Sequence, residues 1–335
     1  MTVIEQFCKD VSKYYPDVND FRGWFIANCV VNSILSIFAI IGNITVICAF
    51  TKTTCSLSTS KILLLGLAIS DLGVGLVVQP LYITVIVETF LGHSISPDSQ
   101  CKTKIAFLVV GCFLAGASFF TVSTISFDRF LAISLHLRYK EIVTEKKVVF
   151  TSTVLWTLSA VAAIGYLLMG DITREAVSTT FATIFFLTTS LTFVRIYLAV
   201  RRHRLQISAQ QRTTEENCRE MALRRRKYKS TLNVLYLYLV FTACYLPYVC
   251  TTMIIAAISH PQALKVFFHI SMTLGFLNSS LNPVIFCWRM QEVRLYVLEV
   301  GVKILPCFKP DRVSRFPKDL SIVNTSFYKR ETSQV

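Results

Sequence analysis

The chain has 335 residues, of which 53% are hydrophobic and only 16% are charged, and its formal net charge is +14. Soluble proteins carry about 25% charged residues, so this composition, with a mean hydropathy of +0.55, excludes an ordinary soluble protein. The apolar residues fall in blocks of about 20–30, the length at which a helix crosses a bilayer. Isolated strands would leave backbone groups unpaired in lipid. The composition therefore predicts an all-α integral membrane protein.

The apolar blocks predict a seven-transmembrane helix bundle over residues 24–288. Its spans cover about residues 24–50, 60–87, 101–134, 148–169, 177–200, 231–258 and 264–288. Residues 1–23 are polar, and we expect an extracellular N-terminus without a cleavable signal peptide. Residues 289–304 carry apolar side chains at helical spacing, which predicts a short amphipathic eighth helix in the interface. Residues 305–335 are polar and are predicted to be a cytoplasmic tail.

The distribution of basic residues predicts the orientation of the bundle. If the N-terminus is outside, the basic residues on the outer side are Lys9, Lys13, Arg22, Lys102, Lys104, Arg174 and Lys265. The others, apart from Arg195 within a span, lie on the cytoplasmic side, in agreement with the positive-inside rule. This topology and attraction to anionic membrane lipids explain the net charge. The charge therefore does not indicate a nucleic-acid partner.

A pair of opposite charges, Asp128-Arg129, lies at the end of the third span. The residues between Lys104 and Asp128 include no ionisable acid or base, and the apolar pattern resumes at Phe130. Charges within a spanning helix are costly unless they have partners or water, which favours a functional role. The alternative is an interfacial pair whose side chains extend to the lipid headgroups.

Asp71 is an isolated carboxylate near the middle of the second span. Polar residues predicted at a similar depth are Asn43, Ser118, Asn278, Ser279 and Asn282. Carboxylate, hydroxyl and amide oxygens suit a small hard cation, and we expect a Na⁺ site. Its predicted ligands are Asp71, Ser118, Asn278 and Asn282. The alternative is a hydrogen-bonded network that only holds helices together.

Each of the seven spans contains a motif, and the motifs occur in a characteristic order. They are Gly42-Asn43-x-x-Val46, Leu67-Ala68-x-x-Asp71, Ser126-Phe127-Asp128-Arg129-Phe130, Trp156, Tyr197, Phe241-x-x-Cys244-Tyr245-x-Pro247 and Asn278-Ser279-Ser280-Leu281-Asn282-Pro283-x-x-Phe286. From about residue 24 to 300 the chain thus resembles the rhodopsin-like (class A) G-protein-coupled receptors. The resemblance implies a plasma-membrane receptor that transduces an extracellular ligand signal to heterotrimeric G proteins.

The resemblance also implies a set of switch residues at the G-protein side. These are Asp128, Arg129, Tyr197, Phe241, Tyr245, Pro247, Asn282, Pro283 and Phe286. Arg129 would pair with Asp128 in the closed state and be released in the open state, and Pro247 would kink the sixth helix. The chain departs from the family at Tyr245 (usually Trp), at Phe286 (usually Tyr) and at Lys227 (often an acid). These departures keep open the alternative of a receptor-like membrane scaffold or partner subunit without autonomous signalling.

The outer halves of the spans predict an aromatic ligand pocket with few polar groups. Its candidate residues are Gln79, Tyr82, Phe107, Gly111, Cys112, Phe185, Tyr245, Tyr248, His269 and Phe276. Gly111 stands where amine receptors of the family have Asp, and Phe276 stands where opsins have the retinal lysine. The link between the fourth and fifth spans is too short for a large lid. We therefore expect a small neutral or lipid-like ligand, although ordinary packing and lipid-facing roles are the alternative for most of these residues.

The cysteine pattern differs from that of the family. Residues 170–176 contain no Cys, so the bridge that usually joins the third helix to the following outer loop cannot form. Cys8 and Cys101 are then the candidates for an extracellular disulfide, and two free thiols are the alternative. Cys307, just after the amphipathic helix, is a candidate palmitoylation site. We expect no N-glycosylation.

Two other functional classes are disfavoured by the residues within the spans. A transporter would need several ionisable residues along a path or repeat-related broken helices, and Asp71 is nearly alone. An intramembrane enzyme would need paired carboxylates, a Ser/Lys pair or a histidine cluster, and His269 has no acidic neighbour in its span. We therefore expect no enzymatic activity, no cofactor besides Na⁺, and a G protein, a small ligand and membrane lipids as partners.

Overall fold

The computed structural model describes residues 8, 15, 21–52, 58–91, 95–135, 138–209, 215–257 and 262–304. The elements are α2 (Arg22–Lys52), α3 (Thr59–Gly73), the π-helical turn η1 (Val74–Val78), α4 (Gln79–Leu91), α5 (Pro97–Ser134), α6 (Tyr139–Ile142), α7 (Glu145–Leu168), α8 (Asp171–Ala209), α9 (Glu215–Ala257), α10 (Gln262–Arg289) and α11 (Gln291–Ile304). Within the described residues, seven helical segments are long and apolar enough to span a membrane. The predicted all-α seven-helix bundle is confirmed.

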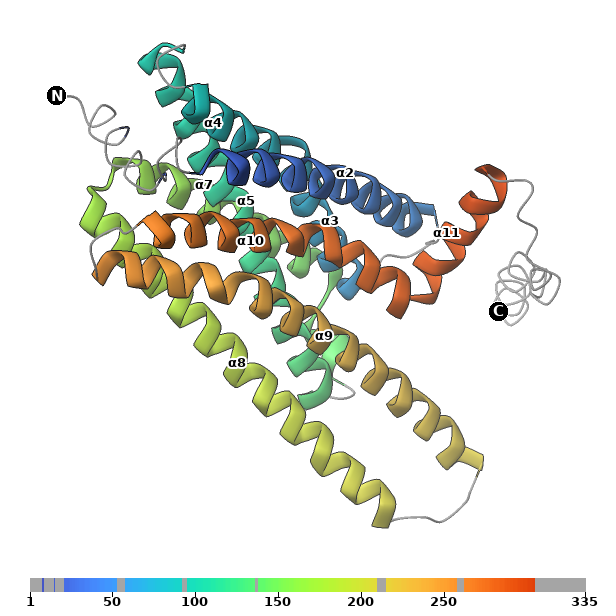
Figure 1. The fold of residues 1–335 in the computed structure, drawn as a ribbon. Helices are drawn as coiled ribbons and strands as arrows, with labels where there is room; N and C mark the ends of the chain where they lie inside the picture. The colour runs from blue at the N-terminus through green and yellow to red at the C-terminus, as the bar shows by residue number, and fades with distance from the viewer. Residues whose placement is uncertain are drawn as a thin grey trace.

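The helices run roughly along one axis, and α5 lies inside the bundle, in contact with α3, α4, α7, α8 and α9 (Figure 1). The end where α5 finishes, near Ser134, is called the inner end here, and the end near Cys101 is called the outer end. Apolar side chains such as Phe38, Phe150 and Val284 are more than half exposed on the surface of the bundle. A lipid-facing surface explains their exposure, because the bilayer replaces the protein core as the apolar surroundings.

Several helix ends differ from the predictions. Pro97 is at the first turn of α5, where its missing N–H is not needed, so this helix begins before the predicted start at residue 101. Ser96 caps this helix by accepting a hydrogen bond from the backbone N–H of Ser99. At the inner end, α8 continues to Ala209 and α9 begins at Glu215, so most of the expected basic loop is helical. This hairpin extends beyond the other helices (Figure 1). The predicted spans end earlier because hydropathy marks only the residues that face lipid, whereas helical hydrogen bonding continues past them.

The second span is interrupted by η1, directly before Gln79 and Pro80. Proline cannot donate a backbone hydrogen bond and its ring clashes with the preceding turn. A single π-helical turn accommodates such an interruption without ending the helix. The turn therefore lets α3 and α4 act as one spanning unit with a changed direction of side chains at Gln79 and beyond.

A close backbone approach joins α2 to α10. A Cβ atom at Gly42 would lie 2.8 Å from both Cβ and Cγ of Pro283. No side chain larger than hydrogen fits there without movement of one helix. Gly42 thus explains why α10 packs closely on α2 beside Asn43, whose Nδ2 donates to the carbonyl of Ser279 at 3.0 Å.

Candidate functional site

The ion pair between Asp128 and Arg129, at the inner end of α5, is formed in this structure. Nε of Arg129 donates to Oδ2 of Asp128 at 3.0 Å, and Nη2 of Arg129 donates to the same oxygen. Asp128 is only 4% exposed, so its side chain does not extend into the interface as an interfacial pair would. The hydroxyl of Ser60 at the start of α3 donates to Oδ2 of Asp128 at 3.4 Å. The pair is therefore part of the contact between α5 and α3.

Tyr139 on α6 completes this network. Its hydroxyl donates to Oδ1 of Asp128 and lies 2.9 Å from Oγ1 of Thr59. Burial, and then the hydrogen bond to Asp128, raises the pKa of Tyr139 to about 12. The hydroxyl is consequently protonated at neutral pH and can donate to the carboxylate. Tyr139, Thr59 and Ser60 could not be predicted as partners of Asp128, because nothing in their local sequence pattern relates them to it.

A cavity of about 310 Å³ opens beside the charge pair, between α3, α5, α9 and α10. It is lined by Ser58, Ser60, Lys61, Leu64, Ile125, Arg129, Val234, Leu237, Ile285, Phe286, Arg289 and Met290. Three of these side chains are cationic and most of the others are apolar, and the lining includes no acid. Lys61 is paired with Glu292 at 2.7 Å and Arg129 is paired with Asp128, so a negatively charged apolar segment in this cavity would compete with these two acids.

An aromatic cluster above the cavity connects α5, α8 and α9. The rings of Phe241 and Tyr245 are 4.5 Å apart, and both lie 4.9 Å from the ring of Phe119. Phe185 contacts Phe119 at 4.5 Å. The predicted switch residues Phe241 and Tyr245 thus lie together with Phe185, a predicted pocket residue. Phe119 was missed, since one apolar residue in a spanning helix has no distinguishing signal.

Asp71 lies at the centre of the predicted polar network. Nδ2 of Asn282 donates to Oδ2 of Asp71 at 2.7 Å, whereas Ser118 hydrogen-bonds to Ser70 at 3.0 Å rather than to Asp71. Oδ1 of Asp71, Oδ1 of Asn278 and Oδ1 of Asn282 are buried without a hydrogen-bond partner. Oxygen atoms left in this way fit the preference of a hard cation for oxygen ligands.

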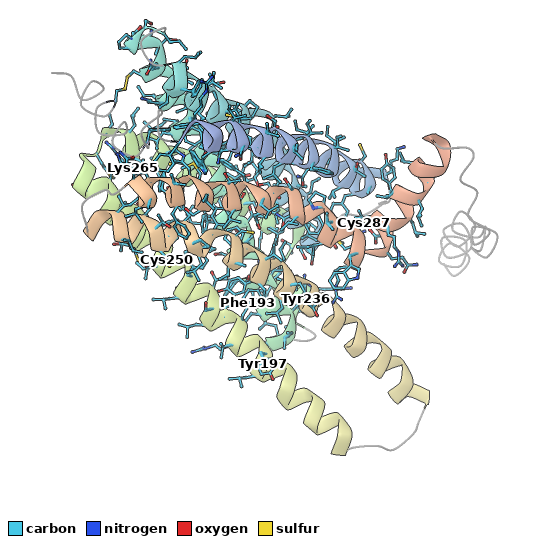
Figure 2. The ribbon with its side chains drawn as sticks, in the orientation of Figure 1. Phe193, Tyr197, Tyr236, Cys250, Lys265 and Cys287 are labelled. Atoms are coloured by element: carbon cyan, nitrogen blue, oxygen red, sulfur yellow. A yellow bond between two sulfur atoms is a disulfide. The ribbon has the colours of Figure 1, made fainter. Side chains whose placement is uncertain are left out.

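The remaining predicted switch residues divide into two groups. Pro283 lies against Gly42, and Phe286 is buried, with its ring 6.4 Å from that of Phe50. Tyr197 is 59% exposed and points away from the bundle on α8 (Figure 2). The structure therefore does not bring Tyr197 to Phe286. Phe193, one turn earlier, packs against Tyr238 of α9 at 4.3 Å.

The predicted pocket residues at the outer end do not form one cluster. Tyr82 brings several together: its ring lies 5.5 Å from Phe107 and 5.2 Å from Phe276, and its hydroxyl is 3.0 Å from Nδ1 of His269. Gln79, one turn deeper than Tyr82, is fully buried. On the side of α9, Tyr248 contacts Phe268 at 5.6 Å. Gly111 and Cys112 lie on α5 between these two groups, where the nearest contact of a Cβ at Gly111 would be Val78.

The outer end contains a disulfide between Cys8 and Cys101, whose Cα atoms are 5.5 Å apart (Figure 2). Lys104, one turn further along α5 than Cys101, is only 7% exposed. Arg174 donates hydrogen bonds to the carbonyls of Tyr166 and Met169 at the end of α7. The sequence predicted Arg174 only as a basic residue on the outer side and gave no sign of these contacts. Cys307 and the side chain of Lys227 lie outside the part that the structure describes.

Comparison with known proteins agrees with this arrangement. Residues 42–286 match the family described as 7 transmembrane receptor (rhodopsin family). The chain belongs to this family. The expected resemblance is thereby confirmed over most of the chain.

Individual relatives of the receptor include proteins with different named ligands. It is 32% identical to adenosine receptor A2b of Gallus gallus over 39% of the chain and 36% of that protein. It is 24% identical to melanocortin receptor 4 of Danio rerio over 79% of the chain and 81% of that protein. It is also 24% identical to the alpha-1A adrenergic receptor of Bos taurus over 78% of the chain and 64% of that protein. The match thus spans about a third of the first relative, and these names do not indicate one ligand.

Proposed function

We propose that this receptor transmits the binding of a small, neutral or lipid-like extracellular ligand to a heterotrimeric G protein at the inner end. The observation that carries the proposal is the closed Asp128–Arg129 pair beside a cavity lined with apolar and cationic side chains. A receptor at rest needs a group that can leave its partner when the inner end opens. Arg129 lines the cavity as well as pairing with Asp128, so it meets this requirement.

The cavity supports a helical protein partner. Its apolar lining, including Leu237 and Phe286, suits the apolar face of an inserted helix. Two of its cations, Lys61 and Arg129, are paired with Glu292 and Asp128 in this structure, and an acidic group on the inserted helix would replace these partners when the inner end opens. Movement of α9 at Pro247 would widen this cavity, because proline weakens the helix at that point.

We also propose that the inner end is cytoplasmic and that the membrane is the plasma membrane. The disulfide at the outer end supports this orientation, since disulfides persist in oxidising compartments. The basic residues of the α8–α9 hairpin support it too, because cytoplasmic segments are enriched in Lys and Arg.

A bound Na⁺ at Asp71 is part of the proposal. Three of the buried oxygens without hydrogen-bond partners, Oδ1 of Asp71, of Asn278 and of Asn282, would serve as ligands. An ion there would hold α3 to α10 through charge–oxygen contacts. This would favour the closed bundle, since a ligand stabilises the state that it binds better.

The proposal is tested by basal G-protein activation in cells that express the wild type, Arg129→Ala and Arg195→Ala at matched surface levels, across the main G-protein classes. Arg195 is an exposed arginine on α8 and is the matched control. We expect a basal signal in one class, its loss in Arg129→Ala and its retention in Arg195→Ala. A signal that Arg129→Ala leaves intact would contradict the role of the pair. No signal from any protein in any class would favour the alternative of a receptor-like scaffold.

A further inference from the structure

The N-terminal segment lies over the outer end of the receptor at both positions that the structure describes there. Cys8 is bonded to Cys101 on α5, and Tyr15 contacts α5 and α10. By contrast, α7 ends at Leu168 and α8 begins at Asp171, so the link between them is only Met169 and Gly170. That link cannot reach across the bundle. Among the described residues before α2, Tyr15 is therefore the one that lies over α10 at this end.

Tyr15 is held by contacts on opposite sides. Its ring lies 4.8 Å from the ring of His269 on α10, and Nζ of Lys104 on α5 lies 5.6 Å from its centroid. Its backbone carbonyl accepts a hydrogen bond of 3.3 Å from Nζ of Lys265, at the outer end of α10 (Figure 2). Tyr15 thus bridges two helices above the aromatic residues of the outer end.

A chain of polar contacts leads from beneath Tyr15 into the bundle. The hydroxyl of Tyr82 is 3.0 Å from Nδ1 of His269. Oγ1 of Thr273 donates to the carbonyl of His269 at 3.0 Å and accepts from Nδ2 of Asn32 at 3.1 Å. The contacts connect α10 to α4 and α2. They lie among aromatic rings, since Tyr82 packs on Phe107 and Phe276.

Two hydrogen-bond acceptors at the end of this chain are left without partners. Oδ1 of Asn32 and Oε1 of Gln79 are buried and unsatisfied, and both residues are fully buried. The residues are neighbours, because Nε2 of Gln79 is 3.4 Å from the carbonyl of Asn32. An unsatisfied buried acceptor costs free energy that a bound donor recovers. Neither residue belongs to the Asp71 network.

The charged side chains at this end have contacts within the receptor, although Oε2 of Glu88 is buried without a hydrogen-bond partner. Glu88 accepts a hydrogen bond of 3.1 Å from Thr103 and interacts electrostatically with Lys104. Lys104 also faces the ring of Tyr15, and Lys265 is engaged by the Tyr15 carbonyl. Asn32 and Gln79 are neutral, and a charge buried beside neutral amides and aromatic rings without an opposite charge is costly. The region therefore favours an uncharged ligand.

We propose that the ligand of this receptor binds between α2, α4 and α10, beneath Tyr15, and that it is a small uncharged aromatic molecule that donates hydrogen bonds to Asn32 and Gln79. Tyr15 forms the roof of this site and is kept in place by the Cys8–Cys101 disulfide. The inference rests on the proposed function, because a ligand site matters only if the protein is a receptor. Its test measures binding alone, so a failure of G-protein coupling does not affect the result.

The test uses the native thiol of Cys29, which is partly buried on α2 and packs against the apolar cluster that contains Tyr82. Cys287, near the end of α10 at the other side of the membrane, is the control thiol. The full-length receptor in nanodiscs is labelled with a permanently charged methanethiosulfonate, which cannot enter through lipid. The rate at each cysteine is read by peptide-resolved mass spectrometry. The probes are resorcinol, with two O–H donors, and 1,3-dimethoxybenzene, with the same ring and no donor.

We expect Tyr15→Ala and Cys8→Ser to speed labelling of Cys29 and Tyr15→Phe, which keeps the ring, to leave it unchanged. Resorcinol should protect Cys29 in the wild type at about tenfold lower concentration than in Asn32→Leu or Gln79→Leu, the loss expected for one buried hydrogen bond. Dimethoxybenzene should protect only weakly, and Cys287 should be unaffected throughout. Thermal unfolding of each variant checks that it is folded. If only one of Asn32→Leu and Gln79→Leu is folded, that variant alone is compared with the wild type.

The proposal is overturned by any of three results. An unchanged Cys29 rate in both Tyr15→Ala and Cys8→Ser would show that Tyr15 is not the roof. Equal protection by the two probes would show that the amide oxygens do not select donors. No protection by resorcinol would show that water alone satisfies Asn32 and Gln79.

Discussion

Tyr139 donates a hydrogen bond to Asp128 from a helix that lies outside the spanning segments. Asp128 also binds Arg129, so one carboxylate accepts from both residues. The bond from Tyr139 holds the carboxylate in position while Arg129 is paired with it. The short α6 is thereby connected directly to the carboxylate from which, as we propose, Arg129 is released on activation.

The first prediction concerns Tyr139→Phe. The substitution removes the hydroxyl and keeps the ring, so Asp128 loses one donor and the closed pair is weakened. Hydrogen bonds to charged groups contribute about 1.5–3 kcal/mol, part of which would favour the open state. We expect a basal G-protein signal several times higher than that of the wild type. Tyr296→Phe, at a tyrosine of α11 whose ring contact with Lys52 is kept by phenylalanine, is the control and should not change the signal.

The effect of Tyr139 should not depend on pH in the neutral range. The pKa of Tyr139 is raised to about 12 in the folded protein, above the usual value of about 10. The stabilisation from the protonated hydroxyl is therefore fully present below about pH 10 and is lost only as the pH rises through about 12. A ratio of mutant to wild-type signal that changes between mildly acidic and mildly basic medium would contradict this account.

The spans, their order and the motif residues on them could be predicted from the sequence. Hydropathy reports the residues that face lipid, and Asp71, Asp128 and Arg129 are conspicuous because charge is rare there. Tyr139 and Phe119 could not be found in this way. Their importance comes from contacts with residues distant in sequence, such as Phe119 with Phe241. Such contacts depend on how the helices pack and leave no local pattern.

Helix ends were predicted less well, and the physical reason is visible at Pro97 and Ala209. Both lie where polar residues continue a helix beyond the lipid. The apolar pattern stops at the membrane surface, whereas backbone hydrogen bonding continues wherever the side chains permit a helix. The position of Tyr15 over the outer end was not predictable either, since it follows from ring contacts with α10 and from the disulfide of Cys8.

The second prediction concerns the proposed Na⁺ site. The purified wild-type receptor should have a higher thermal unfolding temperature in Na⁺ than in an equal concentration of N-methylglucamine. The reason is that a ligand bound only to the folded state stabilises that state. Asp71→Asn should remove this difference by removing the charged ligand. Glu88→Gln, at a buried carboxylate near the outer end, should retain it. A sodium effect that persists in Asp71→Asn would exclude Asp71 as a ligand, and the response to ligand should lose its Na⁺ sensitivity in parallel.

The third prediction concerns orientation. An epitope attached before Met1 should bind antibody on intact cells, and one attached after Val335 should bind only after permeabilisation. The expected result follows from the disulfide at the outer end and from the basic residues at the inner end. Labelling of the C-terminal epitope on intact cells would reverse the topology, and with it the assignment of the inner cavity to a G protein.

The fourth prediction concerns the close approach of α2 and α10. In Gly42→Ala the new methyl group would lie 2.8 Å from Pro283, so α10 must move or the contact must be strained. Overpacking of this kind costs about 1–3 kcal/mol, and we expect a lower thermal unfolding temperature in nanodiscs. Gly165→Ala on α7 is the matched control, because a Cβ there meets nothing within 4 Å. Alanine is about 1 kcal/mol better than glycine within a helix, so this variant should be as stable as the wild type or more so. Equal stability of the two variants would show that the Gly42–Pro283 contact can relax, and Asn282, which precedes Pro283, would then not owe its position beside Asp71 to that contact.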